Sequence, residues 1–325
     1  MRRINSEFQT VNMSEEGQKL SNRDYFGYVE MDDFACYVLA DSLDGDSSIN
    51  SAKLVVESII RDFTEVPSMG KGRLKRMAHR AHTELLRQKA GMHLKASAVV
   101  AVTDYQKIRY VYVGNSRYYL IRNDRILEKT TDQSLTSNLV EAEKITLDQA
   151  AAHEERNNLY SFLGERGTPK IQISKKRKLE NGDVFLLLTR GVWEQCPDEK
   201  LLEIIRDAKE PEEVLYRTED MILEQQDTSE IDNYTMAVTF AQKVYQSPKK
   251  PWSFKKILMV AIPIVLAVAG IGTALFLRHA NIQSKEKELA ACLADGELYL
   301  SNDNYQRAVE LSLIHISEPT RLRRI

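Results

Sequence analysis

The chain has 325 residues, of which 43% are hydrophobic and 28% charged, and its formal net charge at pH 7 is −2. This length allows one large globular domain or two ordinary ones, and the near-neutral charge argues against a nucleic-acid partner. The three cysteines, Cys36, Cys196 and Cys292, form no C-x-x-C pair, which predicts free thiols in a reducing compartment.

Hydrophobic periodicity organises residues 1–245 into one mixed domain. An apolar run at 34–40 predicts a strand, and amphipathic patterns at 51–63 and 73–86 predict two helices. Strands are predicted next at 96–103, 108–113, 118–122, 171–175 and 184–188, then helices at 198–207 and 211–225, and a last strand at 235–240. Strand clusters with separate helix pairs favour an α+β fold over alternating βαβ units.

The second predicted helix is strongly basic. The basic run that leads into and along it is Lys71, Arg73, Lys75, Arg76, His79 and Arg80. Such a face is most often simply solvated, but it also suits an acidic partner or a membrane surface. His79 and His82 lie three residues apart on it without a third metal ligand nearby in sequence, so we expect no zinc site there.

A basic linker at 246–256 precedes an uncharged apolar run at 257–277. Twenty-one helical residues, at about 1.5 Å each, span the roughly 30 Å hydrocarbon core of a bilayer. A buried core helix is the alternative. The denser lysine cluster lies on the N-terminal side of the run, which predicts a single-pass protein with a cytoplasmic N-terminal domain.

Residues 278–310 are amphipathic and resemble the start of a tetratricopeptide repeat, although a generic helical hairpin fits the pattern equally well. Residues 311–325 resemble the translation of a widely used transposase sequencing adapter, and we interpret them as an artefact. The natural chain is therefore expected to continue past Glu310.

Acidic residues recur at the ends of predicted strands and in turns. They are Asp24, Asp41, Asp132 and Asp232. Hard divalent cations prefer oxygen ligands, and a two-metal site needs carboxylates from several segments. Spacing alone leaves open whether these four converge.

Five sequence blocks occur in a diagnostic order. They are Lys19-Leu-Ser-Asn22-Arg23-Asp24, Ala40-Asp41-Ser-Leu-Asp-Gly45, Val113-Gly114-Asn115-Ser116-Arg117 with Thr131-Asp132-Gln133, Gly182-Asp183 to Gly191-Val192-Trp193, and Asp232-Asn233-Tyr234-Thr235. Over roughly residues 15–242 the chain thereby resembles the PP2C, or PPM-type, metal-dependent serine/threonine phosphatases. The resemblance implies a four-layer α-β-β-α sandwich with a metal site at one end of the central β-sandwich.

Carried over residue by residue, the resemblance is mixed. Metal-site positions are retained at Asp24, Asp41, Ser42 and Asp232, where Ser42 replaces a glycine that contributes its carbonyl oxygen. Family positions are degenerate at Lys19, Arg23, Asn115 and Arg190. Lys19 stands where an arginine would hold the substrate phosphate, so it is a candidate phosphate-binding residue. No residue is assigned a catalytic role.

The change to Arg190 decides the functional prediction. The resemblance places a metal-ligating aspartate there, and arginine remains protonated in proteins. A unit charge about 5 Å from a divalent ion is repelled by about 6–7 kcal/mol at an effective dielectric of 20. We therefore expect no cofactor at physiological Mg²⁺ or Mn²⁺, with the Arg190 guanidinium in the metal position, paired with Asp41, Asp232 or both.

Asp44 and Asp46 could supply replacement metal ligands, although Asp-Gly-Asp is more often a plain turn. The predicted function is a membrane-anchored pseudophosphatase that acts in signalling by binding a protein partner, either phosphorylated or unphosphorylated. Two alternatives remain: an active phosphatase that uses Mg²⁺ or Mn²⁺ at a reduced site, and a structural module of a membrane complex.

Overall fold

A computed structural model of the chain describes residues 3, 5–45, 48–88, 93–146, 149–150, 153–226, 230–246, 254–302 and 304–317. It divides into two compact units, Met1–Ser247 and Pro248–Ile325.

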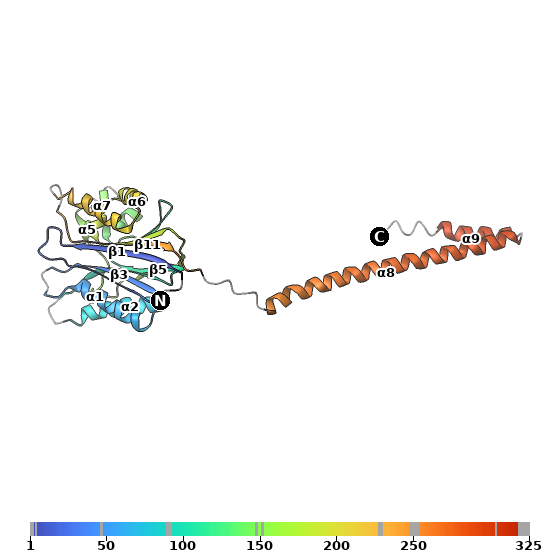
Figure 1. Cartoon of the computed structure of the whole chain (residues 1–325), viewed down its shortest axis with the longest axis horizontal. Coiled ribbons are helices and arrows are strands. Elements are labelled where there is room, and N and C mark those ends of the chain that lie inside the picture. The colour runs from blue at the N-terminus through green and yellow to red at the C-terminus, as the bar shows by residue number, and fades with distance from the viewer. Residues whose placement is uncertain are drawn as a thin grey trace. The chain divides into compact units, whose positions relative to one another are not determined.

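Two antiparallel β-sheets form the centre of the first unit (Figure 1). One sheet has the order β1 (Glu7–Glu15), β11 (Tyr234–Lys243), β10 (Asp183–Leu188), β6 (Arg117–Arg122) and β7 (Arg125–Lys129). The other has the order β2 (Asp24–Glu30), β3 (Ala35–Ser42), β4 (Ala96–Thr103), β5 (Lys107–Val113) and β8 (Gln172–Ile173), and β9 (Arg177–Lys178) also pairs with β5.

Helices cover the outer face of each sheet (Figure 1). The sheet that contains β3 is covered by α1 (Ser51–Glu65) and α2 (Lys71–Leu86), and the sheet that contains β10 by α5 (Arg190–Trp193), α6 (Asp198–Asp207) and α7 (Pro211–Leu223). The connection from β7 to β8 carries α3 (Leu135–Glu141) and the 3₁₀ helix η1 (Glu154–Asn157). The predicted four-layer α-β-β-α sandwich is confirmed.

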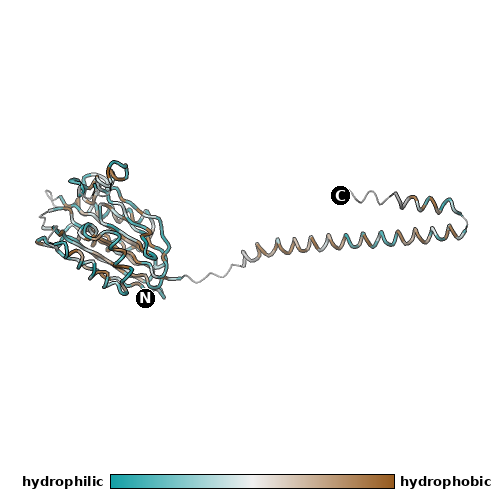
Figure 2. Tube along the Cα trace, turned by 90° about the horizontal axis from the view of Figure 1, so that it is seen from above, coloured by the Kyte–Doolittle hydropathy of each residue, from teal (hydrophilic) through white to brown (hydrophobic). Residues whose placement is uncertain are grey.

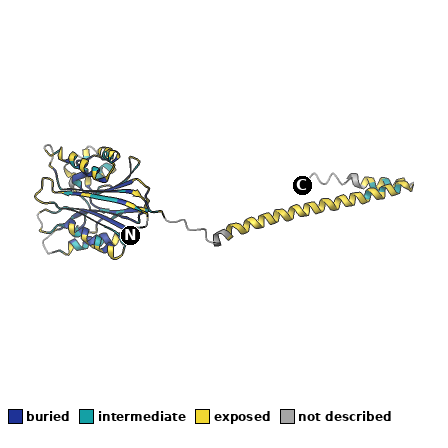
Figure 3. Cartoon of the chain, in the orientation of Figure 1, coloured by how far each residue is buried: buried dark blue, intermediate teal, exposed yellow. Residues whose placement is uncertain are grey.

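Three apolar clusters hold the four layers together, and Figure 3 shows that much of both sheets is buried. Two lie between a sheet and its helices, and the third lies between the sheets. In the third, the Phe185 ring packs edge-on to Tyr37 with centroids 5.2 Å apart and stacks on Tyr118 at 6.4 Å. Such offset and edge-to-face pairs add to the stabilisation from apolar burial.

The sequence did not lead us to expect β1 or β2. β1 is largely polar, but it buries Phe8 and Met13 and pairs with β11 along its whole length, from Glu7 opposite Lys243 to Glu15 opposite Tyr234. This pairing places the first and last strands of the unit side by side. The unit therefore closes on itself with its own core, which indicates that it folds independently of the rest of the chain.

The second unit consists of α8 (Phe254–Ser301) and α9 (Tyr305–Ser317). Figure 2 shows hydrophobic residues concentrated in the first half of α8, and most residues from 258 to 301 are exposed (Figure 3). By length and composition, Leu258–Ser301 is able to cross a membrane. We expected the apolar helix to end at 277, but α8 continues because residues 278–288 contain neither glycine nor proline to stop it. Residues 247–253 of the linker and 318–325 of the adapter-like tail lie outside the described residues.

Candidate functional site

Asp24 and Asp41 lie opposite each other at the same end of the β2–β3 pair. Both carboxyl groups are shielded from water, and burial raises the pKa of Asp24 to about 6 and that of Asp41 well above its usual value. Asp232 raises the pKa of both by its charge, and the charge of Asp24 raises that of Asp41 further. The pair therefore resists carrying two negative charges.

Thr189, the residue that joins β10 to α5, reaches across from the sheet that contains β10 and holds Asp24. The Thr189 hydroxyl donates to Oδ2 of Asp24 over 2.7 Å, and the hydroxyl oxygen accepts the Thr235 amide at 2.8 Å. Thr189 thus connects β2, β10 and β11 at one point. It positions Asp24 and occupies one of its carboxylate oxygens.

Arg190 forms an ion pair with Oδ2 of Asp232. Its Nε also lies 3.9 Å from Oε2 of Glu194, one helical turn further on. Burial alone would lower the pKa of Arg190, but the charges of Asp232, Glu194 and Asp41 raise it above its usual value. The guanidinium therefore stays charged, and in turn it lowers the pKa of Asp41, against the effect of burial.

Two contacts fix the position of Arg190. Gly191 packs so close to β11 that an added Cβ would lie 2.1 Å from the Asn233 carbonyl oxygen. Trp193 donates its indole N–H to the Asn115 carbonyl oxygen over 3.0 Å. These contacts hold the segment Arg190–Trp193 between β11 and the Asn115 turn.

The basic side chains of Lys19 and Arg23 are also engaged by acids. The Lys19 ammonium lies 2.6 Å from Glu230 and 4.0 Å from Asp232. Arg23 pairs with Asp44, whose second oxygen accepts the Lys95 amide over 2.7 Å. Asp44 is thus bound within the loop and is not free to act as a replacement ligand. Asp46 lies outside the described residues.

Ser42 serves mainly to begin α1. Its hydroxyl accepts the Ala52 amide at 2.9 Å and donates to Asn50, the N-cap residue of that helix. Asn115 is buried, and its amide hydrogen bonds to Ser97, while its side-chain Oδ1 has no hydrogen-bond partner among the described residues.

A hollow of about 700 Å³ brings most of these residues together. Of the predicted site residues, it is lined by Lys19, Arg23, Asp41, Ser42, Asn115, Arg190 and Asp232, whereas Asp24 lies buried beneath it. Sequence reasoning missed Lys95 and Phe162, which also line it. The Lys95 ammonium stands 5.4 Å from the centre of the Phe162 ring. No local pattern indicated either residue, because an antiparallel bridge between Ala96 and Leu163 brings their segments together.

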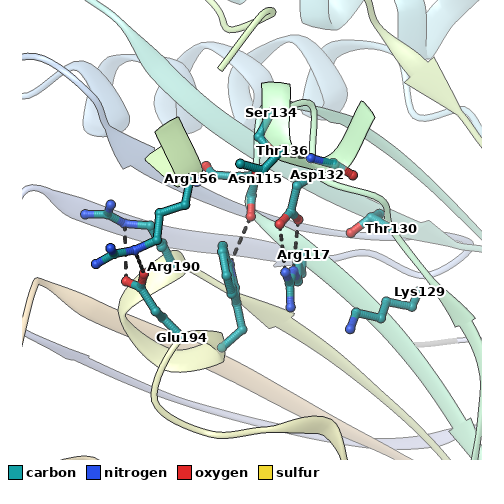
Figure 4. A network of polar contacts seen from close by, with 12 residues as sticks. Asn115, Arg117, Lys129, Thr130, Asp132, Ser134, Thr136, Arg156, Arg190 and Glu194 are labelled. Atoms are coloured by element: carbon teal, nitrogen blue, oxygen red, sulfur yellow. Dashed lines mark hydrogen bonds and ion pairs between the residues drawn. The ribbon is translucent and has the colours of Figure 1, made fainter. Parts of the chain in front are cut away.

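Asp132 belongs to a separate network (Figure 4). Its two oxygens accept from Arg117 at 2.9 and 2.7 Å, and the Arg117 guanidinium lies 3.6 Å from the Trp193 ring centre. Figure 4 also shows Glu194 between Arg190 and Arg156, with the Arg156 Nε at 3.0 Å. A second hollow of about 720 Å³ lies beside this network.

The carboxylates in and beneath the first hollow do not fit a pair of divalent cations, because two of them are already engaged. Asp232 is neutralised by Arg190, and Asp24 is buried and bound to Thr189. Within the described part of the chain, no group of three or more His, Cys, Asp or Glu residues is placed to hold a metal ion.

No protein-family model matches the chain. Among curated proteins, it is 27% identical over 140 residues to the protein phosphatase PhpP of Streptococcus pneumoniae, covering 43% of this chain and 55% of PhpP. It is 29% identical over 101 residues to the serine/threonine protein phosphatase PstP of Mycobacterium tuberculosis, covering 31% of this chain and 19% of PstP. The matched segment thus spans about half the length of PhpP and less of PstP.

Solved structures match over most of the first unit. Stp1 from Staphylococcus aureus superposes with a TM-score of 0.66 at 18% identity, over 76% of this chain and 98% of Stp1. The catalytic domain of PstP, solved with two manganese ions, superposes with a TM-score of 0.61 at 20% identity, over 73% of this chain and 99% of that domain. The curated relatives and the solved structures that share this fold are serine/threonine phosphatases of the PP2C, or PPM, type, and together they support placing the chain in that family.

Proposed function

We propose that the first unit is a pseudophosphatase domain that binds a phosphorylated protein segment in the hollow beside Arg190. We further propose that α8 anchors it in a membrane, with the first unit on the cytoplasmic side. The ion pair between Arg190 and Asp232 carries the first proposal. It puts a permanent positive charge among the carboxylates where the family's metal ions would bind.

The loss of hydrolysis follows from electrostatics. In a metal-dependent hydrolase, the metal ions supply the activated water and neutralise developing charge. Here the Arg190 guanidinium takes up the charge of Asp232 and is attracted by Asp41. A divalent ion would have to displace this cation and also deprotonate the buried Asp24–Asp41 pair, whose pKa values are raised.

Phosphate recognition does not need the metal ions. Phosphate is bound well by ammonium and guanidinium groups, and Lys19 and Lys95 both line the hollow. Lys19 is partly neutralised by Glu230, whereas no ion pair is recorded for Lys95 among the described residues. Phe162 and Leu159 supply apolar wall for the flanking peptide. Lys95 is therefore the stronger candidate for the phosphate contact.

Catalysis is tested with the fragment 1–246, p-nitrophenyl phosphate and a phosphothreonine peptide in millimolar Mn²⁺. We expect no turnover by the wild type above a metal-free blank, and measurable turnover by the double variant Arg190→Asp, Asn115→Asp. Turnover by the wild type would instead support the second candidate, an active phosphatase with a reduced site. That candidate is favoured by the convergence of Asp24, Asp41 and Asp232.

Binding is tested by fluorescence polarisation with the same peptide in phosphorylated and unphosphorylated forms. We expect preference for the phosphorylated peptide and a severalfold loss of affinity in Lys95→Gln. The matched control is Lys107→Gln, an exposed lysine at the start of β5, remote from the hollow's lining. Equal affinity for both peptides would refute the binding role and leave a structural module.

A further inference from the structure

One face of α2 carries an unusual density of positive charge. The helix contains five Lys and Arg residues and one Glu, a net charge of +4, in a chain whose formal net charge is −2. The cations are Lys71, Arg73, Lys75, Arg76 and Arg80, and Arg87 follows at the C-cap. The outward face of the neighbouring helix adds no net charge, because it alternates Lys53, Glu57, Arg61 and Glu65.

Folding does not require this arrangement. Arg73 and Arg80 both pair with the buried Asp62 of α1, but for Lys71, Lys75 and Arg76 no ion pair is recorded in the part of the chain that the structure describes. Cations in the first turn oppose the helix dipole, and α2 has no acidic residue there. Like charges four residues apart, such as Lys71 and Lys75, also repel each other.

The opposite face of α2 is buried, so the orientation of the basic face is fixed. Leu74, Met77, Ala81 and Leu85 are at most 2% exposed and pack in the core between the helix pair and its sheet. The basic face also borders a hollow of about 450 Å³, which is lined by Arg61, Arg76, Arg80 and Arg87 together with the acidic Asp62, Glu65 and Glu84. The lining of this hollow is of mixed charge, and the excess of positive charge lies on α2 itself.

We infer that this face, defined by Lys71, Lys75, Arg76, Arg80 and Arg87, binds the surface of a membrane rich in anionic phospholipid. Anionic lipid suits it because each Lys or Arg near such a surface is attracted by the negative surface potential, and the attractions of several cations add. A second observation points to a membrane: the same chain carries the apolar α8, able by length to cross one. The inference rests on the anchoring part of the proposed function and not on the phosphate-binding part.

The chain itself keeps the domain near a bilayer in which α8 is inserted. Seven residues, 247–253, connect residue 246 to the start of α8, and seven residues span at most about 25 Å. A weak intrinsic affinity is then enough, because tethering gives the basic face a high effective concentration at the lipid surface.

The test uses fragment 1–246, which has its own core, and sedimentation with vesicles of phosphatidylcholine containing 0% or 30% phosphatidylglycerol. At 0.1 M salt we expect binding only to the anionic vesicles, and its loss at 0.5 M salt, where exposed charges are screened. The variant Lys71→Gln, Lys75→Gln, Arg76→Gln should bind at least about tenfold more weakly. It should also melt no lower than the wild type, since it relieves repulsion on an exposed face.

The matched control, Lys200→Gln, Arg206→Gln, Lys209→Gln, removes three exposed cations from the helix pair on the other face. It should bind anionic vesicles within about twofold of the wild type. The inference would be overturned if the fragment bound neutral vesicles as well as anionic ones, or if it did not bind anionic vesicles at 0.1 M salt. It would also be overturned if both triple variants lost affinity for anionic vesicles to the same extent. Phosphopeptide affinity, measured on the same proteins, should not change in the α2 variant, which separates this inference from the phosphate-binding role.

Discussion

Replacing Arg190 by methionine should destabilise the first unit, and by more at high pH than at low pH. Methionine keeps much of the side-chain volume and removes the charge. Two unit charges 4 Å apart attract each other by about 4 kcal/mol at an effective dielectric of 20. Because the side chains of Arg190 and Asp232 are 21% and 32% exposed, solvent screening and the cost of ordering them reduce the expected loss to about 1–3 kcal/mol.

The pH dependence follows from Asp41. Arg190 lowers the pKa of Asp41, so its removal should raise that pKa further above the unfolded value. A carboxyl whose pKa is raised by folding favours the folded state below its unfolded pKa, and this contribution is lost as pH rises through the folded pKa. Arg190→Met should therefore lower the free energy of unfolding more at pH 8 than at pH 5.

Urea unfolding of fragment 1–246 at both pH values measures this effect. Arg217→Met is the control, because Arg217 is 46% exposed and lies 3.8 Å from Glu213. It should cost less than about 1 kcal/mol, equally at both pH values. A variant Arg190→Met as stable as the wild type at pH 8 would show that the guanidinium does not neutralise the acidic cluster.

Three further outcomes are expected. Gly164→Ala should lower the free energy of unfolding by about 2–4 kcal/mol, measured by heat or urea, because Gly164 has φ of +87° and a Cβ there would lie 2.0 Å from the Leu94 carbonyl oxygen. The control Gly182→Ala, with the same φ and open space around it, should cost about 1 kcal/mol. Equal costs for the two variants would rule out the clash with Leu94. Burial lowers the pKa of His82, whose Nδ1 accepts the Gly164 amide. The free energy of unfolding should therefore fall as pH drops below about 6.5, and it should fall less steeply with pH in His82→Gln. The same pH dependence in the variant would exclude His82 as the source. Millimolar Mn²⁺ should raise the melting temperature of Arg190→Asp and leave that of the wild type unchanged, and a rise in the wild type would mean that metal binds despite the guanidinium.

Local sequence patterns were sufficient to predict those helices and strands whose apolar residues repeat at the helical or strand period. α1, β4 and α6 match their predicted ranges to within two residues, because each buries one face, or a continuous run, that repeats at the helical or strand period. β1 lacked such a pattern. It is a polar edge strand held by its backbone pairing with β11 and by hydroxyl contacts such as Thr10 with Thr239 at 3.0 Å, and neither partner is near it in sequence.

The candidate site, too, was predicted in part from the sequence and decided in part by the tertiary structure. The motif order in the sequence placed Asp24, Asp41, Arg190 and Asp232 at one site, because those short blocks keep their register at strand ends. Which carboxylate Arg190 pairs with, and which of Lys19 and Lys95 has an acidic partner among the described residues, depended on side chains that meet from separate strands and loops. Charge interactions fall off with distance and depend on burial, so they were decided only when the two sheets and the loop after η1 came together in the folded chain.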